Sequence, residues 1–189
     1  MIENFNEVKD ISSRKLADSS LGKVAESINS ERFIMILDKS IVKLCDVSKN
    51  CPTENGVWQG ERGNSKWCPD IDYVPLKSNP EGKTWGQILK MFGIDGINFK
   101  DGEPDFSSIS KGTVEIEGFS EDRSENFDKA DIQQAKKYGC TPEEVKKWRK
   151  ENGYTWHECK DMGTMQKVPS IVHNNIPHRG GISEVKKGV

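Results

Sequence analysis

Residues 154–181 have the sequence Y-T-W-H-E-C-K-D-M-G-T-M-Q-K-V-P-S-I-V-H-N-N-I-P-H-R-G-G, and this stretch decides the fold that we predict. Aromatic and β-favouring residues in 154–159 and 164–168 predict two strands, and the polar K-D-M-G segment between them predicts a turn. Trp156 is expected to pack the hairpin. The stretch therefore begins with a β-hairpin.

A short helix is expected after the hairpin. Pro169 ends the second strand, and Ser170 is expected to cap a helix over 171–175 because its hydroxyl can accept a hydrogen bond from the first turn. Pro177 limits how far that helix can extend. The predicted order is strand, strand, helix.

All three histidines of the chain, His157, His173 and His178, fall within this stretch. The prediction places His157 on the first strand and His173 on the helix that faces it. Imidazole binds divalent transition metals and moves protons near neutral pH, so the cluster indicates a metal or acid/base site. The alternative is three unrelated histidines. A ββα unit of this size buries little apolar surface, so a bound metal would also help to stabilise it.

Upstream of the hairpin, capping residues and glycines predict three helices, and alternation predicts a strand. The helices are expected at 84–92, 127–138 and 142–152. Val114 and Ile116 alternate with glutamates, which is typical of a half-exposed strand. The predicted class is α+β, with a C-terminal ββα unit on a mixed, loop-rich helical N-terminal part.

Composition allows one ordinary domain or two small ones, because the chain has 189 residues. Its net charge of −2 gives no signal for nucleic acid over the whole chain. The charge is uneven, however: residues 130–189 hold 11 Lys+Arg against 7 Asp+Glu, which gives +4 and leaves −6 for the rest. This asymmetry is expected of a protein that handles a polyanion at one end, although chance explains it equally well.

Four basic residues of the predicted helix over 142–152 could follow a phosphate backbone without contacting bases. They are Lys146, Lys147, Arg149 and Lys150. The alternative is an ordinary solvated helix face.

The five cysteines include no C-x-x-C pair, which argues against a four-cysteine zinc site. We expect free thiols in a reducing compartment, with a disulfide from Cys51 to Cys45 or to Cys68 as the alternative. The N-terminus lacks a basic segment followed by an apolar one, and no run approaches the roughly 20 apolar residues that span a bilayer. The sequence therefore predicts no signal peptide, no membrane segment and a cytoplasmic location in the producing cell.

Residues 154–181 resemble the HNH/endonuclease VII superfamily, the ββα-metal (His-Me finger) nucleases that include the DNase colicins. Within it, they are most similar to toxin nucleases with a W-H-H or W-H-E motif. The segments G-E-R-G-N-S-K-W-C-P-D (60–70) and G-I-D-G-I-N-F-K-D-G-E-P-D-F-S (93–107) also resemble the N-terminal portion of such C-terminal polymorphic-toxin domains. The resemblance implies a nuclease domain over about 55–184. Residues 1–50 are expected to form a separate N-terminal helical or accessory segment.

The resemblance implies one divalent metal ion, Zn, Mg, Mn or Ni, held by His157, His173 and His178. For His178 two roles remain open: this ligand role, or contact with the scissile phosphate or the leaving group. Glu158 takes the position of the general base, for which its ordinary pKa of about 4.3 makes it weaker than imidazole. Alternatively, His157 is the base and Glu158 is a ligand or a surface residue, since neighbours on a strand point to opposite faces.

Three further residues are expected to serve substrate binding. Gln166 falls where the superfamily has an asparagine that pins the loop, Lys167 follows it, and Arg179 precedes two glycines that suit phosphate contact. The implied function is a metal-dependent endonuclease that hydrolyses DNA with little sequence specificity. It would be a bacterial toxin, secreted or injected into target bacteria and paired with a cognate immunity protein. The alternatives are an RNase or tRNase toxin on the same fold, and a non-catalytic zinc-binding interaction module.

Overall fold

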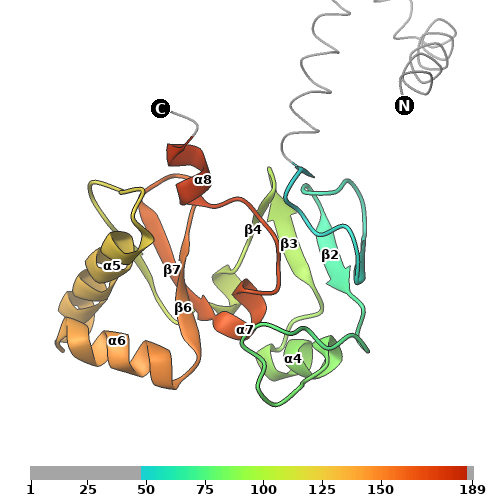
Figure 1. The fold of residues 1–189 in the computed structure, drawn as a ribbon, viewed down its shortest axis with the longest axis horizontal. Coiled ribbons are helices and arrows are strands. Elements are labelled where there is room, and N and C mark those ends of the chain that lie inside the picture. Colours follow the sequence, from blue (N-terminus) through green and yellow to red (C-terminus); the bar gives the residue numbers. More distant parts are fainter. Residues whose placement is uncertain (1–47, 187–189) are drawn as a thin grey trace, which may run out of the picture. The chain divides into compact units, whose positions relative to one another are not determined.

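The computed structural model describes residues 48–186, and the segment proposed over residues 1–50 lies almost wholly outside them. The described fold is α+β, with two small antiparallel sheets and helices packed against them (Figure 1). In chain order the elements are β1 (Gly56–Trp58), β2 (Lys66–Pro69), α4 (Trp85–Phe92), β3 (Ile97–Lys100), β4 (Glu103–Pro104), η1 (Ser107–Ile109), β5 (Thr113–Glu115), α5 (Arg123–Tyr138), α6 (Pro142–Glu151), β6 (Tyr154–Glu158), β7 (Thr164–Pro169), α7 (Ser170–His173) and α8 (Gly181–Val185).

The predicted hairpin is present as β6 and β7, which pair antiparallel with His157 opposite Gln166. In the turn, the Asp161 carboxylate accepts hydrogen bonds from the backbone N–H groups of Gly163 and Thr164. This Asx-type turn fixes the register of the hairpin. β7 is the central strand of a sheet ordered β5-β7-β6, so β6 lies at an edge.

The expected helix after the hairpin exists, but two details of its prediction are wrong. Ser170 does not cap α7: it is the first helical residue, and its N–H donates to the carbonyl of Gly153. Pro169 remains in β7 and precedes the helix without a side-chain cap. α7 ends at His173, earlier than the predicted residue 175, and so is only a single turn.

The β5-β7-β6 sheet separates two apolar cores. Met165 and Trp156 point to the face that α5 and α6 cover, where they join Val114, Ile116 and Ala130. Val168 points to the opposite face, which α7 and η1 contact. His157 lies on the Val168 face and Glu158 on the Trp156 face, because side chains alternate along a strand. The two neighbouring side chains of the motif therefore leave β6, an edge strand, on opposite faces.

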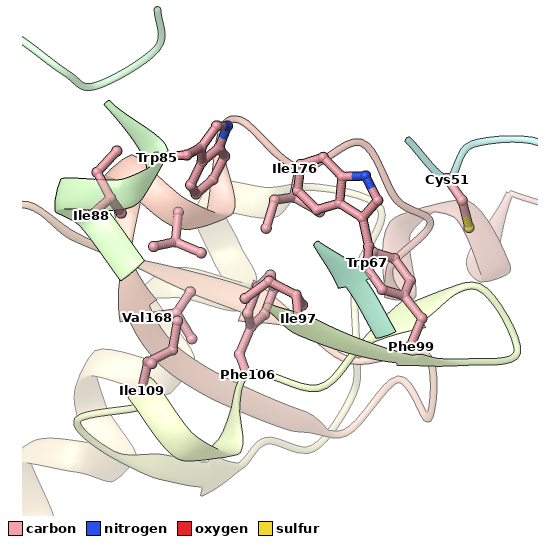
Figure 2. Packing of buried hydrophobic residues seen from close by; sticks show 11 residues of the cluster. Cys51, Trp67, Trp85, Ile88, Ile97, Phe99, Phe106, Ile109, Val168 and Ile176 are labelled. Atoms are coloured by element: carbon pink, nitrogen blue, oxygen red, sulfur yellow. The ribbon is translucent and has the colours of Figure 1, made fainter. Parts of the chain in front are cut away.

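The larger core joins the β1-β2-β3-β4 sheet to α4, α7 and the Val168 face of the hairpin (Figure 2). Its buried members are Cys51, Trp67, Trp85, Ile88, Ile97, Phe99, Phe106, Ile109, Val168, Val172 and Ile176. The prediction of α4 is confirmed: Thr84 and Gln87 form a capping box, and Gly93 ends the helix in the left-handed conformation. The histidine-bearing hairpin is thus anchored by a core that reaches back to residue 51.

α5 begins four residues earlier than predicted, because Asp122 caps it by accepting a hydrogen bond from Ser124 N–H. Its Asp131 is buried and pairs with Arg149 of α6 at 2.7 Å, while Trp156 Nε1 donates to the same carboxylate at 2.8 Å. One carboxylate therefore links α5, α6 and β6. The expected packing role of Trp156 is confirmed, since only 1% of it is exposed.

No disulfide joins the cysteines of residues 48–186, so the alternative pair Cys51–Cys68 is not formed. Cys45 lies outside the described residues. Within the described part of the chain, no helix is long and apolar enough to cross a bilayer.

Candidate functional site

The three histidines converge from three segments: β6 supplies His157, α7 supplies His173 and the following loop supplies His178. Their ring centroids lie 5.0 to 5.4 Å apart, and one nitrogen of each ring lies within 4.8 Å of the others. The ring of Phe106 contacts all three, with centroid distances of 5.0 to 5.9 Å. Apolar packing by Phe106, the residue before η1, therefore holds the three imidazoles together.

Hydrogen bonds determine which nitrogens face the centre of the cluster. His173 Nδ1 lies 3.1 Å from Asn174 Oδ1, and His178 Nδ1 lies 2.7 Å from the carbonyl oxygen of Ile176. Both partners are acceptors, so each Nδ1 carries the proton and each Nε2 keeps its lone pair. His157 Nδ1 lies 3.3 Å from His173 Nε2. These residues fit a divalent transition metal, because imidazole lone pairs converge and outer hydrogen bonds fix the ring orientations.

Burial keeps two of these rings neutral. Desolvation, followed by the charge of His157, lowers the pKa of His173 to about 4. The same two causes lower the pKa of His178 well below its ordinary value of 6.5. Neutral imidazole is the form that binds metal, so both rings are ready to bind at neutral pH.

The histidines line a cleft of about 620 Å³ beside the edge strand β6. Glu158 and Arg123 also line it, and Lys77 approaches from the segment before α4. Of the described residues around this cleft, Glu158 is the sole carboxylate. The cleft thus combines a metal-ligating group, one proton acceptor and two cations.

Glu158 is held by α5. Asn126 Nδ2 donates to its Oε1 at 2.9 Å and Arg123 Nε donates to its Oε2 at 2.8 Å. The carboxylate is 4% exposed, whereas the Arg123 side chain is 62% exposed. Glu158 therefore orients a guanidinium whose remaining N–H groups are available to an anion in the cleft.

Residues 96–180 match the family model of the DNase/tRNase domain of colicin-like bacteriocins. This match supports a nuclease toxin domain in this part of the chain. It includes all three histidines, Glu158 and Arg123. No curated protein matches the chain.

Arg123 was not identified from the sequence. It lies 35 residues before Glu158 and at the start of a helix that was expected to begin later. The capping residue Asp122 was the available signal, since it extends α5 back to Arg123.

Two residues of the matched domain that were expected to bind substrate lie away from the cleft. Lys167 points to the α6 side of the sheet, with its Nζ 4.6 Å from the centroid of the Trp148 ring, and burial lowers its pKa. Gln166 shares the face of His157 but lines a different pocket, together with Glu103 and Cys159. The structure therefore groups neither side chain with Glu158 and Arg123.

Arg179 is also buried, and it is not among the described residues that line the cleft. The two glycines that follow it are required by packing. A Cβ at Gly180 would lie 2.6 Å from the carbonyl oxygen of Glu158, and one at Gly181 would lie 2.7 Å from that of Cys159. These glycines bring the chain against the end of β6.

The proposed phosphate-tracking residues of α6 do not act as one surface. Arg149 is 6% exposed and pairs with Asp131, so its role is structural. Lys146 pairs with Asp128 at 2.8 Å on the surface, and Lys147 lies 3.9 Å from Glu151. The expectation for Arg149 is therefore wrong, and Lys146 and Lys147 each already face a carboxylate.

Proposed function

We propose that this chain is a metal-dependent endonuclease of the HNH type that hydrolyses DNA phosphodiester bonds. The observation that carries this proposal is the convergence of three imidazole nitrogens in a cleft that also holds Glu158 and Arg123. The order β6, β7, α7 supports a ββα-metal unit, and the family match over residues 96–180 supports nuclease chemistry.

His157, His173 and His178 would hold one divalent cation. Bound there, the cation would act as a Lewis acid on the scissile phosphate and stabilise the departing 3′-oxygen. Asn174 and the carbonyl of Ile176 orient two of the rings by accepting their Nδ1–H protons. We therefore assign His178 to the ligands, because its Nδ1 donates to the carbonyl oxygen of Ile176 and its Nε2 keeps its lone pair.

Glu158 would accept the proton of the attacking water. With the histidines as ligands, it is the one basic acceptor left among the described residues of the cleft. Asn126 and Arg123 each engage one of its oxygens, and each oxygen retains a further lone pair. Arg123, with Lys77 beside the cleft, would bind the phosphate and position it for attack.

A second candidate function is cleavage of tRNA or another RNA at the same site. The description of the matching family names both DNase and tRNase domains. A non-catalytic zinc module is less favoured, because the described histidine cluster has three ligating side chains and a closed structural site requires four.

In either case we propose a bacterial toxin that is delivered into target cells and neutralised by an immunity protein in the producer. The similarity to bacteriocin domains supports this role.

The experiment incubates the chain in parallel with supercoiled plasmid and with total tRNA. Each of the two reactions is run with EDTA, and then again after Mg²⁺, Mn²⁺, Zn²⁺ or Ni²⁺ has been supplied. We expect nicking of the plasmid that EDTA abolishes and a metal restores, and no such activity in His157→Ala. Cleavage of tRNA alone would establish the second candidate. Cleavage that persists in EDTA would contradict the metal-dependent account.

A further inference from the structure

A second group of potential ligands lies on the other side of the His157 ring. Glu103 of β4 and Cys159, which follows β6, place a carboxylate oxygen and a sulfur within 4.8 Å of one another and of a His157 nitrogen. Glu103 and Cys159 line a pocket that is separate from the histidine cleft and that also contains Asp105 and Asp161. The set therefore combines N, O and S atoms on an acidic surface.

The nitrogen that faces this group is His157 Nε2. The residue is 1% exposed, and Nε2 has no hydrogen-bond partner. The nearest carboxylate atom, Glu103 Oε1, is 3.5 Å away, which is too long for a good hydrogen bond. A buried polar atom without a partner is destabilising, and such an atom in a native fold indicates a missing ligand or a functional role.

The other two members of the group are positioned for a cation. The backbone N–H of Lys160 donates to Glu103 Oε1 at 2.7 Å and fixes the carboxylate beside the ring. Cys159 directly follows β6 and lines the same pocket as Glu103, with its sulfur within 4.8 Å of the carboxylate oxygen. A cation bound there would displace the thiol proton to solvent.

We propose that Glu103, His157 and Cys159 form a second metal site, selective for a thiophilic divalent cation of the Zn²⁺ class. A set of one sulfur, one imidazole nitrogen and one carboxylate oxygen suits zinc, whereas magnesium prefers oxygen ligands alone. The site leaves a fourth position for water or for an exogenous ligand.

The two sites share one imidazole, and this makes them compete. A neutral ring has one lone pair and one N–H. A cation on Nε2 leaves the proton on Nδ1, where it can donate across 3.3 Å to His173 Nε2. Two lone pairs are then removed from the three-histidine cluster. Occupancy of the second site would therefore inhibit cleavage. This inhibition rests on the function proposed above, whereas the existence of the second site does not rest on it.

The first test is optical and independent of activity. Co²⁺ is titrated into the metal-free chain of 189 residues, and the thiolate-to-cobalt charge-transfer absorption is recorded. We expect this band in the unmodified chain and its loss in Cys159→Ser, with circular dichroism used to verify that the variant folds. Cys140→Ser is the matched control, because Cys140 is exposed and is not a member of the group; it should keep the band. A band that survives in Cys159→Ser, or that is absent from the unmodified chain, overturns the proposal.

The second test measures inhibition of Mn²⁺-dependent plasmid nicking by added Zn²⁺. Without Zn²⁺, Cys159→Ser should nick plasmid at the unmodified rate. Its Zn²⁺ concentration for half-inhibition should be at least about tenfold higher than that of the unmodified chain, because the second site has lost one ligand. Equal inhibition of both chains would refute the competition between the sites. If no metal supports nicking, the proposed function fails, while the cobalt titration still decides whether the second site exists.

Discussion

Replacing Asp131 with alanine should destabilise the fold far more than a surface substitution on the same helix. The Asp131 carboxylate is 2% exposed and accepts hydrogen bonds from Arg149 Nε, Arg149 Nη2 and Trp156 Nε1. Its loss leaves a guanidinium that is 7% exposed without its carboxylate. Removal of one partner from a buried pair costs about 3–5 kcal/mol. For a domain of this size, the expected fall in Tm is roughly 6–20 °C.

The assay is urea unfolding followed by tryptophan fluorescence, with Asp128→Ala as the matched control. Asp128 lies on the same helix and pairs with Lys146, but both side chains are about half exposed. An exposed pair contributes about 1 kcal/mol or less, so the control should unfold nearly as the unmodified chain does. Equal losses of unfolding free energy in the two variants would refute the assignment of Asp131 as the link between α5, α6 and β6.

Further predictions concern the cleft. Glu158→Gln should reduce plasmid nicking by roughly 10²–10⁴-fold with little change in metal affinity, as expected when a general base is lost; a change of less than about tenfold would remove Glu158 from that role. Arg123→Ala should lower kcat/KM by roughly 10- to 100-fold through the lost phosphate contact, and Arg123→Lys should recover part of it; an unchanged kcat/KM would contradict the contact. Asn174→Ala should weaken metal binding by about 10- to 100-fold, measured by calorimetry, because the orientation of His173 is lost; unchanged affinity would rule out this support. In EDTA, the free energy of unfolding should fall as the pH drops from 6.5 toward 4, because His173 and His178 bind protons in the unfolded chain but not in the folded one. In His173→Gln, the free energy of unfolding should depend less steeply on pH. An unchanged pH dependence would contradict a buried, neutral His173 ring.

The hairpin and its histidines could be predicted because they depend on local information. Strand-favouring residues, an Asp-containing turn and Pro169 lie next to one another in the chain, and alternation along β6 follows from strand geometry. The same alternation indicated that His157 and Glu158 point apart, which is what the structure shows. The convergence of His157 and His173 followed from the predicted order of the elements.

The remainder of the site depends on contacts that no local pattern carries. Arg123 and Asn126 reach Glu158 across more than thirty residues, and Glu103 of β4 lies 3.5 Å from His157 of β6. Charge alone was misleading for Lys167, Arg149 and Arg179, because a cation in the sequence looks the same whether it is solvated or buried beside an aromatic ring or a carboxylate. Lys167 and Arg149 are buried where α5 and α6 pack on the sheet, and Arg179 is buried in the segment between α7 and α8.

The most direct test of the three-histidine centre measures bound metal and plasmid nicking in the same samples of the unmodified chain and of His173→Ala. His173 is the informative position, because Asn174 orients it and because it contacts both other rings. We expect the unmodified chain to nick plasmid with the metal bound, and His173→Ala to lose both the metal and at least about a hundredfold of the nicking rate. A variant that has lost the metal and nicks plasmid at the unmodified rate would contradict the three-histidine centre.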